Sequence, residues 1–308
     1  MKRLYILVAF TLVVGCMTLS HDESSSRIPD KLTKTKDHYD SPIKIRHRAY
    51  LAQTVDSSGM LSSDILARIH DLWKFQLEKQ QSLILHSHQN SDQDRRSDSN
   101  LEQIISELNR QGVRFFLKPE IMDVKIHKRL KPRGIIRNQT TETMIQMKLA
   151  VFNTRTKNKE LEKIRTMTFE DSEVRISGDQ LNYKLDEFLE KYQEKILEHI
   201  NELILDFQDD LAQILKRTEW EGRIALIQGD RVYLNVGEIS GVRIGDILRV
   251  TDTGEDVYDP QSGKFIGKTE GRVKGTIEVI SFFVEDGSVA VIHSGGGFRE
   301  NDRVLLNW

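Results

Sequence analysis

The sequence predicts an α+β protein in which an N-terminal α/β sandwich domain with a mixed sheet precedes a small C-terminal antiparallel β-barrel of the SH3-like kind. Short strands alternate with amphipathic helices as far as residue 217, and glycines then recur between short alternating runs. The 308 residues suffice for two domains of roughly 100 to 200 residues each. We therefore predict a signal at 1–15, a tether at 16–43, an α/β domain at 44–217 and a barrel at 218–308.

The first sixteen residues have the pattern of an export signal. Lys2 and Arg3 precede an apolar stretch at 4–14 that is too short to span a membrane. Gly15 then precedes Cys16, the only cysteine of the chain. This ending resembles the lipobox of bacterial lipoproteins, which implies cleavage before Cys16 and lipid attachment, including palmitate, at that residue. The alternative, a buried cysteine in a helix, predicts a free N-terminus.

A lipid anchor at Cys16 has further implications. Several acyl chains together meet the requirement for stable membrane anchoring, and no cysteine remains for a disulfide. Met17 stands where lipoproteins kept at the inner membrane often carry Asp, so the resemblance implies the outer membrane, with the protein facing the periplasm. The polar stretch 18–43 contains Pro29 and Pro42 and predicts a flexible tether.

The charge balance argues against nucleic acid as a partner. The chain has 45 basic and 47 acidic residues, for a net charge of −2, which provides no strong field for steering a polyanion. Beyond the signal, no stretch approaches the roughly 20 apolar residues of a membrane-spanning helix. We expect the body of the protein to be water-soluble.

The first half of the α/β domain alternates strand and helix. Strands are predicted at 46–55 and 82–86. Ser62 or Ser63 caps a helix whose apolar residues between 65 and 77 share one face. Ser99 and Glu102 form a capping box for a second helix, which Gly112 ends.

The second half of this domain contains longer elements. Apolar residues occupy odd positions at 113–117 and even positions at 122–126. This change of face along one strand predicts that Pro119 lies at a bulge or an edge. A strand at 143–152 is predicted to form a hairpin with one near 163–169. Apolar residues between 185 and 214 recur every 3.6 positions and predict a long helix, with a break near Asp209-Asp210.

The C-terminal segment predicts many short strands with glycine turns. The runs 222–227, 231–236, 247–250, 271–280, 289–292 and 303–306 alternate in hydropathy, and Asp259-Pro260 with Ser262-Gly263 provides the tip of a hairpin.

Two resemblances concern function. The element order at 45–215 is similar to a domain shared by the curli secretion channel, penicillin-binding-protein activator lipoproteins and the middle of flagellar assembly protein T. The segments Asn235-Val236-Gly237, 241–246, 259–263 and Gly267 resemble the C-terminal domain of flagellar assembly protein T, where the role of such residues is structural. Together, the two resemblances imply a protein that assembles or stabilises a flagellar ring by contacting basal-body proteins and neighbouring copies of itself. The lipobox, and the lack of an extra N-terminal domain, depart from that protein.

No catalytic constellation emerges, so we predict a protein that is not an enzyme and has neither cofactor nor metal. His86 and His88 alternate on a strand without further ligands, residues 293–297 fit a hairpin loop better than a phosphate loop, and Asp206, Asp209 and Asp210 fit a solvated face. Two alternatives to a ring protein remain. One is a lipoprotein activator of a cell-wall synthase, and the other is a subunit of an outer-membrane secretion channel.

Overall fold

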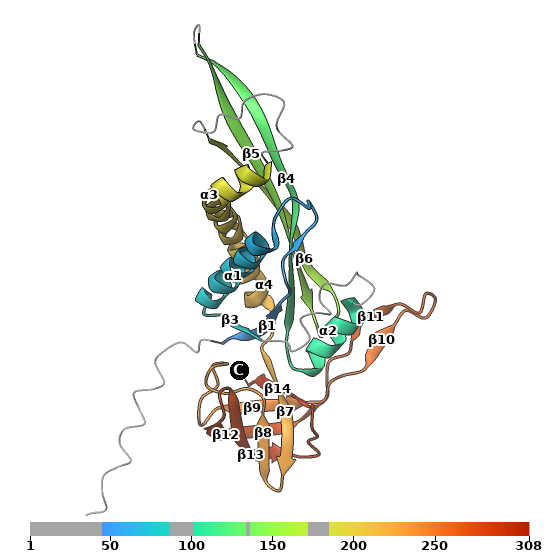
Figure 1. Ribbon diagram of the computed structural model, residues 1–308. Helices are drawn as coiled ribbons and strands as arrows, with labels where there is room; N and C mark the ends of the chain where they lie inside the picture. Colours follow the sequence, from blue (N-terminus) through green and yellow to red (C-terminus); the bar gives the residue numbers. More distant parts are fainter. Residues whose placement is uncertain (1–44, 87–100, 134–135, 172–184, 308) are drawn as a thin grey trace, which may run out of the picture. The chain divides into compact units, whose positions relative to one another are not determined.

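A mixed sheet forms the centre of the first folded part. The computed structural model describes residues 45–86, 101–133, 136–171 and 185–307, and its strands lie in the order β3-β1-β4-β5-β6, with β2 beside β4 (Figure 1). Strand β1 is parallel to β3 and β4, whereas β4, β5 and β6 are antiparallel. The elements are β1 His47–Leu51, β2 Val55–Asp56, α1 Ser63–Lys79, β3 Leu83–Leu85, α2 Leu101–Arg110, β4 Phe115–Arg133, β5 Ile136–Asn153, β6 Lys159–Asp171, α3 Leu185–Asp206 and α4 Gln208–Arg217.

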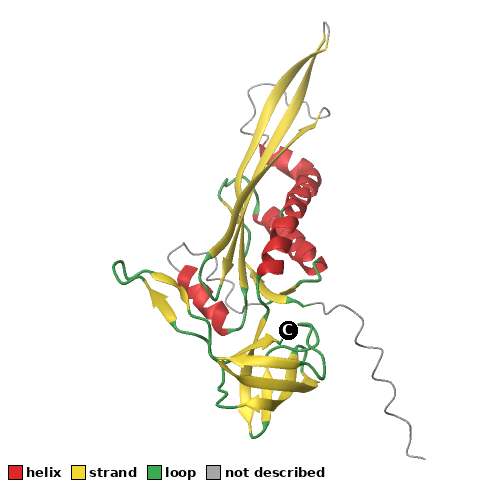
Figure 2. Cartoon of the chain, turned by 180° about the vertical axis from the view of Figure 1, so that it is seen from behind, coloured by secondary structure: helices red, strands yellow, loops and turns green. Residues whose placement is uncertain are grey.

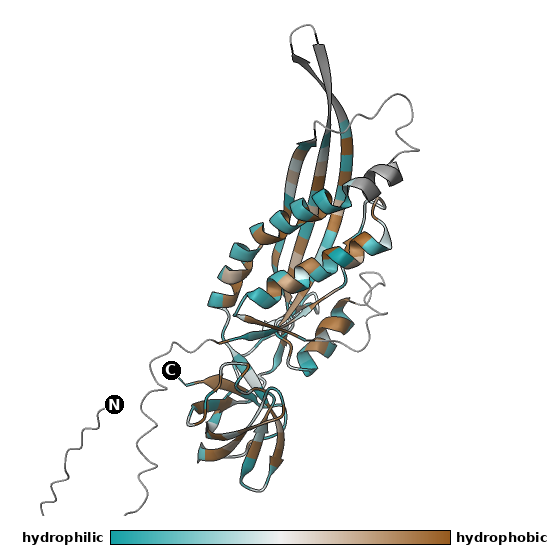
Figure 3. Ribbon diagram, turned by 60° about the vertical axis from the view of Figure 1, so that its left-hand side comes forward, coloured by the Kyte–Doolittle hydropathy of each residue, from teal (hydrophilic) through white to brown (hydrophobic). Residues whose placement is uncertain are grey.

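Helices cover both faces of this sheet, so the prediction of an α/β sandwich is confirmed (Figure 2). Alternate residues of β1 and β4 point to opposite faces. Ala49 and Phe115 join α1, α3 and α4 in one core, whereas Tyr50 and Phe116 pack with α2 in another. Hydrophilic and hydrophobic residues alternate in bands along the helices, as the amphipathic pattern requires (Figure 3).

The larger core is centred on aromatic rings of two helices. Trp73 of α1 and Phe207, between α3 and α4, are both fully buried, with ring centroids 5.8 Å apart. Ser62 caps α1 by accepting a hydrogen bond from the backbone N–H of Ile65, as predicted. The proposed cap partner Ser99 lies outside the described residues. Among the residues described, no helix has the length and apolar character needed to cross a membrane.

The predicted bulge in β4 does not lie at Pro119. The bulge in β4 falls between Ile121 and Asp123, and Pro119 is paired with Leu149. The backbone carbonyl of Leu117 accepts a hydrogen bond from the N–H of Ala52, so Leu117 directs its backbone groups towards the segment between β1 and β2. Pro119, two residues later in the strand, directs its backbone the same way. The N–H that proline lacks would therefore face the gap between β1 and β2, and Pro119 is tolerated in this inner strand.

The predicted break near Asp209-Asp210 is confirmed, because α3 ends at Asp206 and α4 begins at Gln208, with Phe207 between them. Both aspartates lie in the first turn of α4, where negative charge is favoured.

The second folded part is a closed six-stranded antiparallel barrel, which confirms the predicted fold class. Its strands neighbour one another in the order β12-β13-β8-β7-β14-β9, and β9 pairs with β12 to close the barrel. A separate hairpin, β10-β11, has its tip at Asp259, whose side chain accepts from the backbone of Gln261 and Ser262. The bounds are β7 Glu221–Gln228, β8 Arg231–Leu234, β9 Ile247–Thr251, β10 Asp256–Tyr258, β11 Phe265–Lys268, β12 Val273–Phe283, β13 Gly287–Gly295 and β14 Arg303–Leu306.

Candidate functional site

The residues examined for metal or catalytic chemistry are engaged in ordinary contacts or lie apart. His86 follows β3, and its backbone N–H donates to Ala49; His88 lies outside the described residues. Asp210 forms ion pairs with Lys163 and Arg165 of β6. Within the described ranges, no three metal-ligating side chains gather. The predicted loop at 293–297 is wrong in part, because β13 continues to Gly295.

Cys16 and the whole tether also lie outside the described residues. Lipid attachment at Cys16 therefore stays a prediction.

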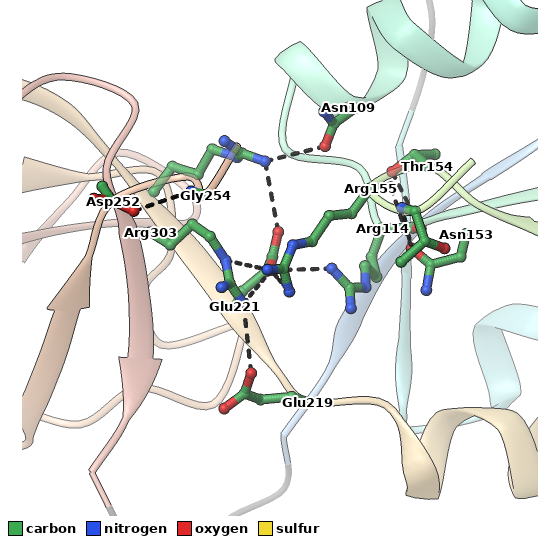
Figure 4. Close-up of polar contacts among 12 residues, drawn as sticks. Asn109, Arg114, Asn153, Thr154, Arg155, Glu219, Glu221, Asp252, Gly254 and Arg303 are labelled. Atoms are coloured by element: carbon green, nitrogen blue, oxygen red, sulfur yellow. Dashed lines mark hydrogen bonds and ion pairs between the residues drawn. The ribbon is translucent and has the colours of Figure 1, made fainter. Parts of the chain in front are cut away.

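A buried ion cluster lies where the barrel contacts the α/β sheet, and we call it the arginine cluster: Arg114, Arg155, Arg223 and Arg303 around Glu221. Figure 4 shows Arg114, Arg155 and Arg303 beside Glu221. Glu221 begins β7. Its Oε2 lies 2.9 Å from Nη2 of Arg303, 3.0 Å from Nη1 of Arg114 and 3.8 Å from Nη1 of Arg155. Its Oε1 lies 3.5 Å from Nη2 of Arg223.

These residues come from both folded parts. Arg114 precedes β4 and Arg155 lies in the turn between β5 and β6, whereas Arg223 and Arg303 lie on the barrel strands β7 and β14. Arg223 also donates to the side chain of Asn109 at the end of α2, at 3.0 Å. The cluster therefore connects the barrel with the sheet and with α2.

Burial and charge determine the electrostatics of this cluster. The side chains of Arg114 and Glu221 are each 9% exposed, and that of Arg303 is 4% exposed. Burial by itself would raise the pKa of Glu221, but the surrounding guanidinium groups lower it below its ordinary value. Burial, followed by repulsion from Arg303, lowers the pKa of Arg155 to about 10.

A second charged contact connects the same two parts. Arg48 of β1 donates from Nη2 to Oδ2 of Asp286, at 2.9 Å, in the turn before β13. The Asp286 carboxylate also accepts hydrogen bonds from the backbone N–H groups of Gly237 and Ser240 and from the Ser240 hydroxyl. Gly237 is required here, because an added Cβ would lie 2.8 Å from the carbonyl oxygen of Gly287.

A pocket of about 650 Å³ lies beside the arginine cluster. Its lining includes His47, Lys216, Arg217, Glu219 and Trp220. Glu219 connects the pocket with the cluster, because its carboxylate lies 3.4 Å from Nη2 of Arg303.

His47, in the wall of this pocket, makes the stability of the protein depend on pH. Burial, followed by repulsion from Arg114, lowers its pKa from 6.5 to about 4. The unfolded chain binds a proton at His47 more tightly than the folded protein does. The contribution of neutral His47 to the free energy of unfolding is therefore present above pH 6.5 and is lost as the pH falls towards 4. Over this pH range we expect the free energy of unfolding of wild type to fall by about 2–3 kcal/mol more than that of His47→Gln. Urea unfolding at several pH values measures this difference. Parallel curves for the two proteins would contradict the assignment.

Sequence reasoning missed the arginine cluster because its members are far apart along the chain and share no spacing. One signal was present. The segment Asn235-Val236-Gly237, which we assigned to a structural turn, lies at this junction: the Asn235 side chain accepts from the backbone of Arg223, and Gly237 binds Asp286.

No known protein family and no curated protein matches this chain. Solved structures give distant matches. A hypothetical protein from Chlamydia trachomatis is 12% identical over 52% of this chain and 98% of its own, with a TM-score of 0.29. A lipoprotein from Neisseria meningitidis is 7% identical over 49% and 99%, with a TM-score of 0.28. A minor lipoprotein from Acinetobacter baumannii is 11% identical over 56% and 90%, with a TM-score of 0.24. Likenesses at this level assign no function to the chain.

Proposed function

We propose that this chain is a non-catalytic lipoprotein, anchored at the outer membrane through Cys16 and facing the periplasm. In this proposal it helps to assemble or stabilise a ring in the cell envelope, of the kind that surrounds the flagellar basal body. Its partners are envelope or basal-body proteins and neighbouring copies of itself. The export signal that ends at Cys16 and the resemblance of both domains to flagellar assembly protein T support this role.

One structural observation carries the part of the proposal that concerns assembly. Among the described strands, β3 pairs only with β1 and β6 pairs only with β5, so the sheet has two different free edges. Strand β6 is 13 residues long. Pairing of one edge with the other edge of the next copy is a head-to-tail contact, and such contacts produce rings when the rotation closes.

The test is purification of the full-length protein from membranes in mild detergent, with imaging and mass spectrometry of the proteins that accompany it. Ring-shaped particles recovered with basal-body proteins, together with loss of motility on deletion, are the expected result. Recovery with a penicillin-binding protein would replace the proposal with the activator role. A conducting pore would replace it with the secretion channel.

The lipid anchor has its own test. We expect Cys16→Ala to leave the membrane fraction and to lack the acylated N-terminal peptide, because the acyl chains attach only to the cysteine thiol and the new N-terminus. The variant Met17→Asp serves as the matched control. It should keep its lipid and be retained at the inner membrane, as seen by fractionation and mass spectrometry. An unmodified wild-type N-terminus would refute the anchor.

A further inference from the structure

We propose that the arginine cluster binds a small oxyanion of the phosphate class, held chiefly by Arg155 and Arg114. This inference is independent of the proposed role in an envelope ring. It depends on the charge balance, the hydrogen bonding and the surroundings of the cluster.

The charge balance of the cluster leaves positive charge in excess. The guanidinium groups of Arg114, Arg155, Arg223 and Arg303 each contribute one positive charge. Within the described residues, their carboxylate partners are Glu221 and Glu219. Glu219 is 53% exposed and is shared with Arg249, so it contributes little compensation. At least two positive charges therefore remain in a largely buried place, where uncompensated charge is unfavourable.

The hydrogen bonds of the cluster show which arginine side chains have unpaired donors. Within the described part of the chain, Nε of Arg155, Nε of Arg114 and Nε of Arg223 have no hydrogen-bond partner, although each is buried. Arg155 lies 3.8 Å from the Glu221 carboxylate, beyond hydrogen-bond distance. Arg223 is occupied by Asn109 and Asn301. Arg155 and Arg114 are therefore the available ligands, and a guanidinium fork matches two oxygens of a tetrahedral anion.

The surroundings indicate a small anion. The side chain of Arg155 is 14% exposed, which leaves room for contact with an ion but not with a polymer or a flat membrane surface. The pocket of about 650 Å³ reaches Glu219 beside the cluster, and Lys216 and Arg217 add positive charge to its lining. Inorganic phosphate and a small phosphate monoester share the chemistry that this arrangement recognises.

The experiment compares melting temperatures of the full-length protein in detergent, in sodium phosphate and in sodium chloride of equal ionic strength. For wild type we expect phosphate at millimolar concentration to raise the melting temperature by about 2–4 °C more than chloride does. For Arg155→Gln we expect this difference to vanish, with an equal or higher melting temperature in chloride because repulsion is relieved. The control Arg68→Gln, which removes an arginine paired with Glu194 on the surface, should keep the difference.

Glycerol phosphate distinguishes the two sources of the phosphate group. A shift equal to that of inorganic phosphate indicates a monoester as the natural ligand, whereas no shift indicates the free ion. Titration calorimetry of wild type with inorganic phosphate tests binding without any variant, and saturable heat absent with chloride is expected. Equal melting temperatures of wild type in phosphate and chloride would overturn the proposal. So would a lower melting temperature of Arg155→Gln in chloride, because Arg155 would then be a purely structural partner of Glu221.

Discussion

Glu221→Gln is expected to lower the free energy of unfolding by about 3–5 kcal/mol, because it leaves buried guanidinium groups without their buried carboxylate. Among the described residues, Glu221 is the buried carboxylate in contact with these arginines, so the substitution leaves Arg114 and Arg303 as buried charges without a buried anion. The free energy follows from urea unfolding of the full-length protein at pH 7, monitored by tryptophan fluorescence because Trp220 is adjacent in sequence.

The matched control for this prediction is Glu219→Gln. Glu219 touches Arg303 as well, but its side chain is 53% exposed, so the expected loss is below about 1 kcal/mol. The pH dependence gives a second check. Because the folded-state pKa of Glu221 lies below its unfolded value of 4.5, its stabilisation is present above pH 4.5 and disappears as the pH falls through the folded pKa. Glu221→Gln should lack this component. Equal losses for the two variants would contradict the assignment.

Asp286→Ala is expected to lower the free energy of unfolding by about 2–4 kcal/mol, because it leaves a part-buried guanidinium group and backbone donors without a partner. Arg48, whose side chain is 17% exposed, loses its carboxylate, and the N–H groups of Gly237 and Ser240 lose their acceptor. The turn that holds the barrel against β1 should then loosen. Hydrogen exchange of residues 235–242, together with urea unfolding, measures both consequences.

Glu285→Ala is the control for Asp286→Ala. Glu285 is exposed and precedes Asp286 in the same turn, so its removal changes the local charge equally without removing the described contacts. We expect a change within about 0.5 kcal/mol. A comparable loss in both variants would show that the turn responds to net charge and not to the Arg48 contact.

The elements with strong periodicity could be predicted from the sequence. The face of α1 that contains Ile65 and Trp73, the hairpin of β5 and β6, and the barrel strands followed from helical or alternating patterns, since burial imposes those periods directly. The bulge was misplaced for a physical reason. Pro119 suggested a break in strand pairing. In the structure, however, it faces the gap between the short strands β1 and β2, where no partner strand needs the N–H that proline lacks.

The candidate site could not be predicted, because it depends on how the barrel meets the sheet. Arg114 precedes a predicted strand, and Arg155 lies in a turn; nothing local distinguishes either from a solvated arginine. Charge patterns along the chain report only neighbours within a few positions. The convergence of four arginines on Glu221 is a property of the tertiary structure alone.

The meeting of distant segments at Glu221 has a kinetic consequence. Arg303 is 82 residues from Glu221 in sequence, and Arg223 is 114 residues from Asn109, so the cluster forms only after the sheet and the closing strand β14 are in place. Contacts made after the rate-limiting step slow unfolding without speeding folding. We therefore expect the cluster to slow unfolding, and so to lengthen the lifetime of the folded protein, with little effect on the folding rate.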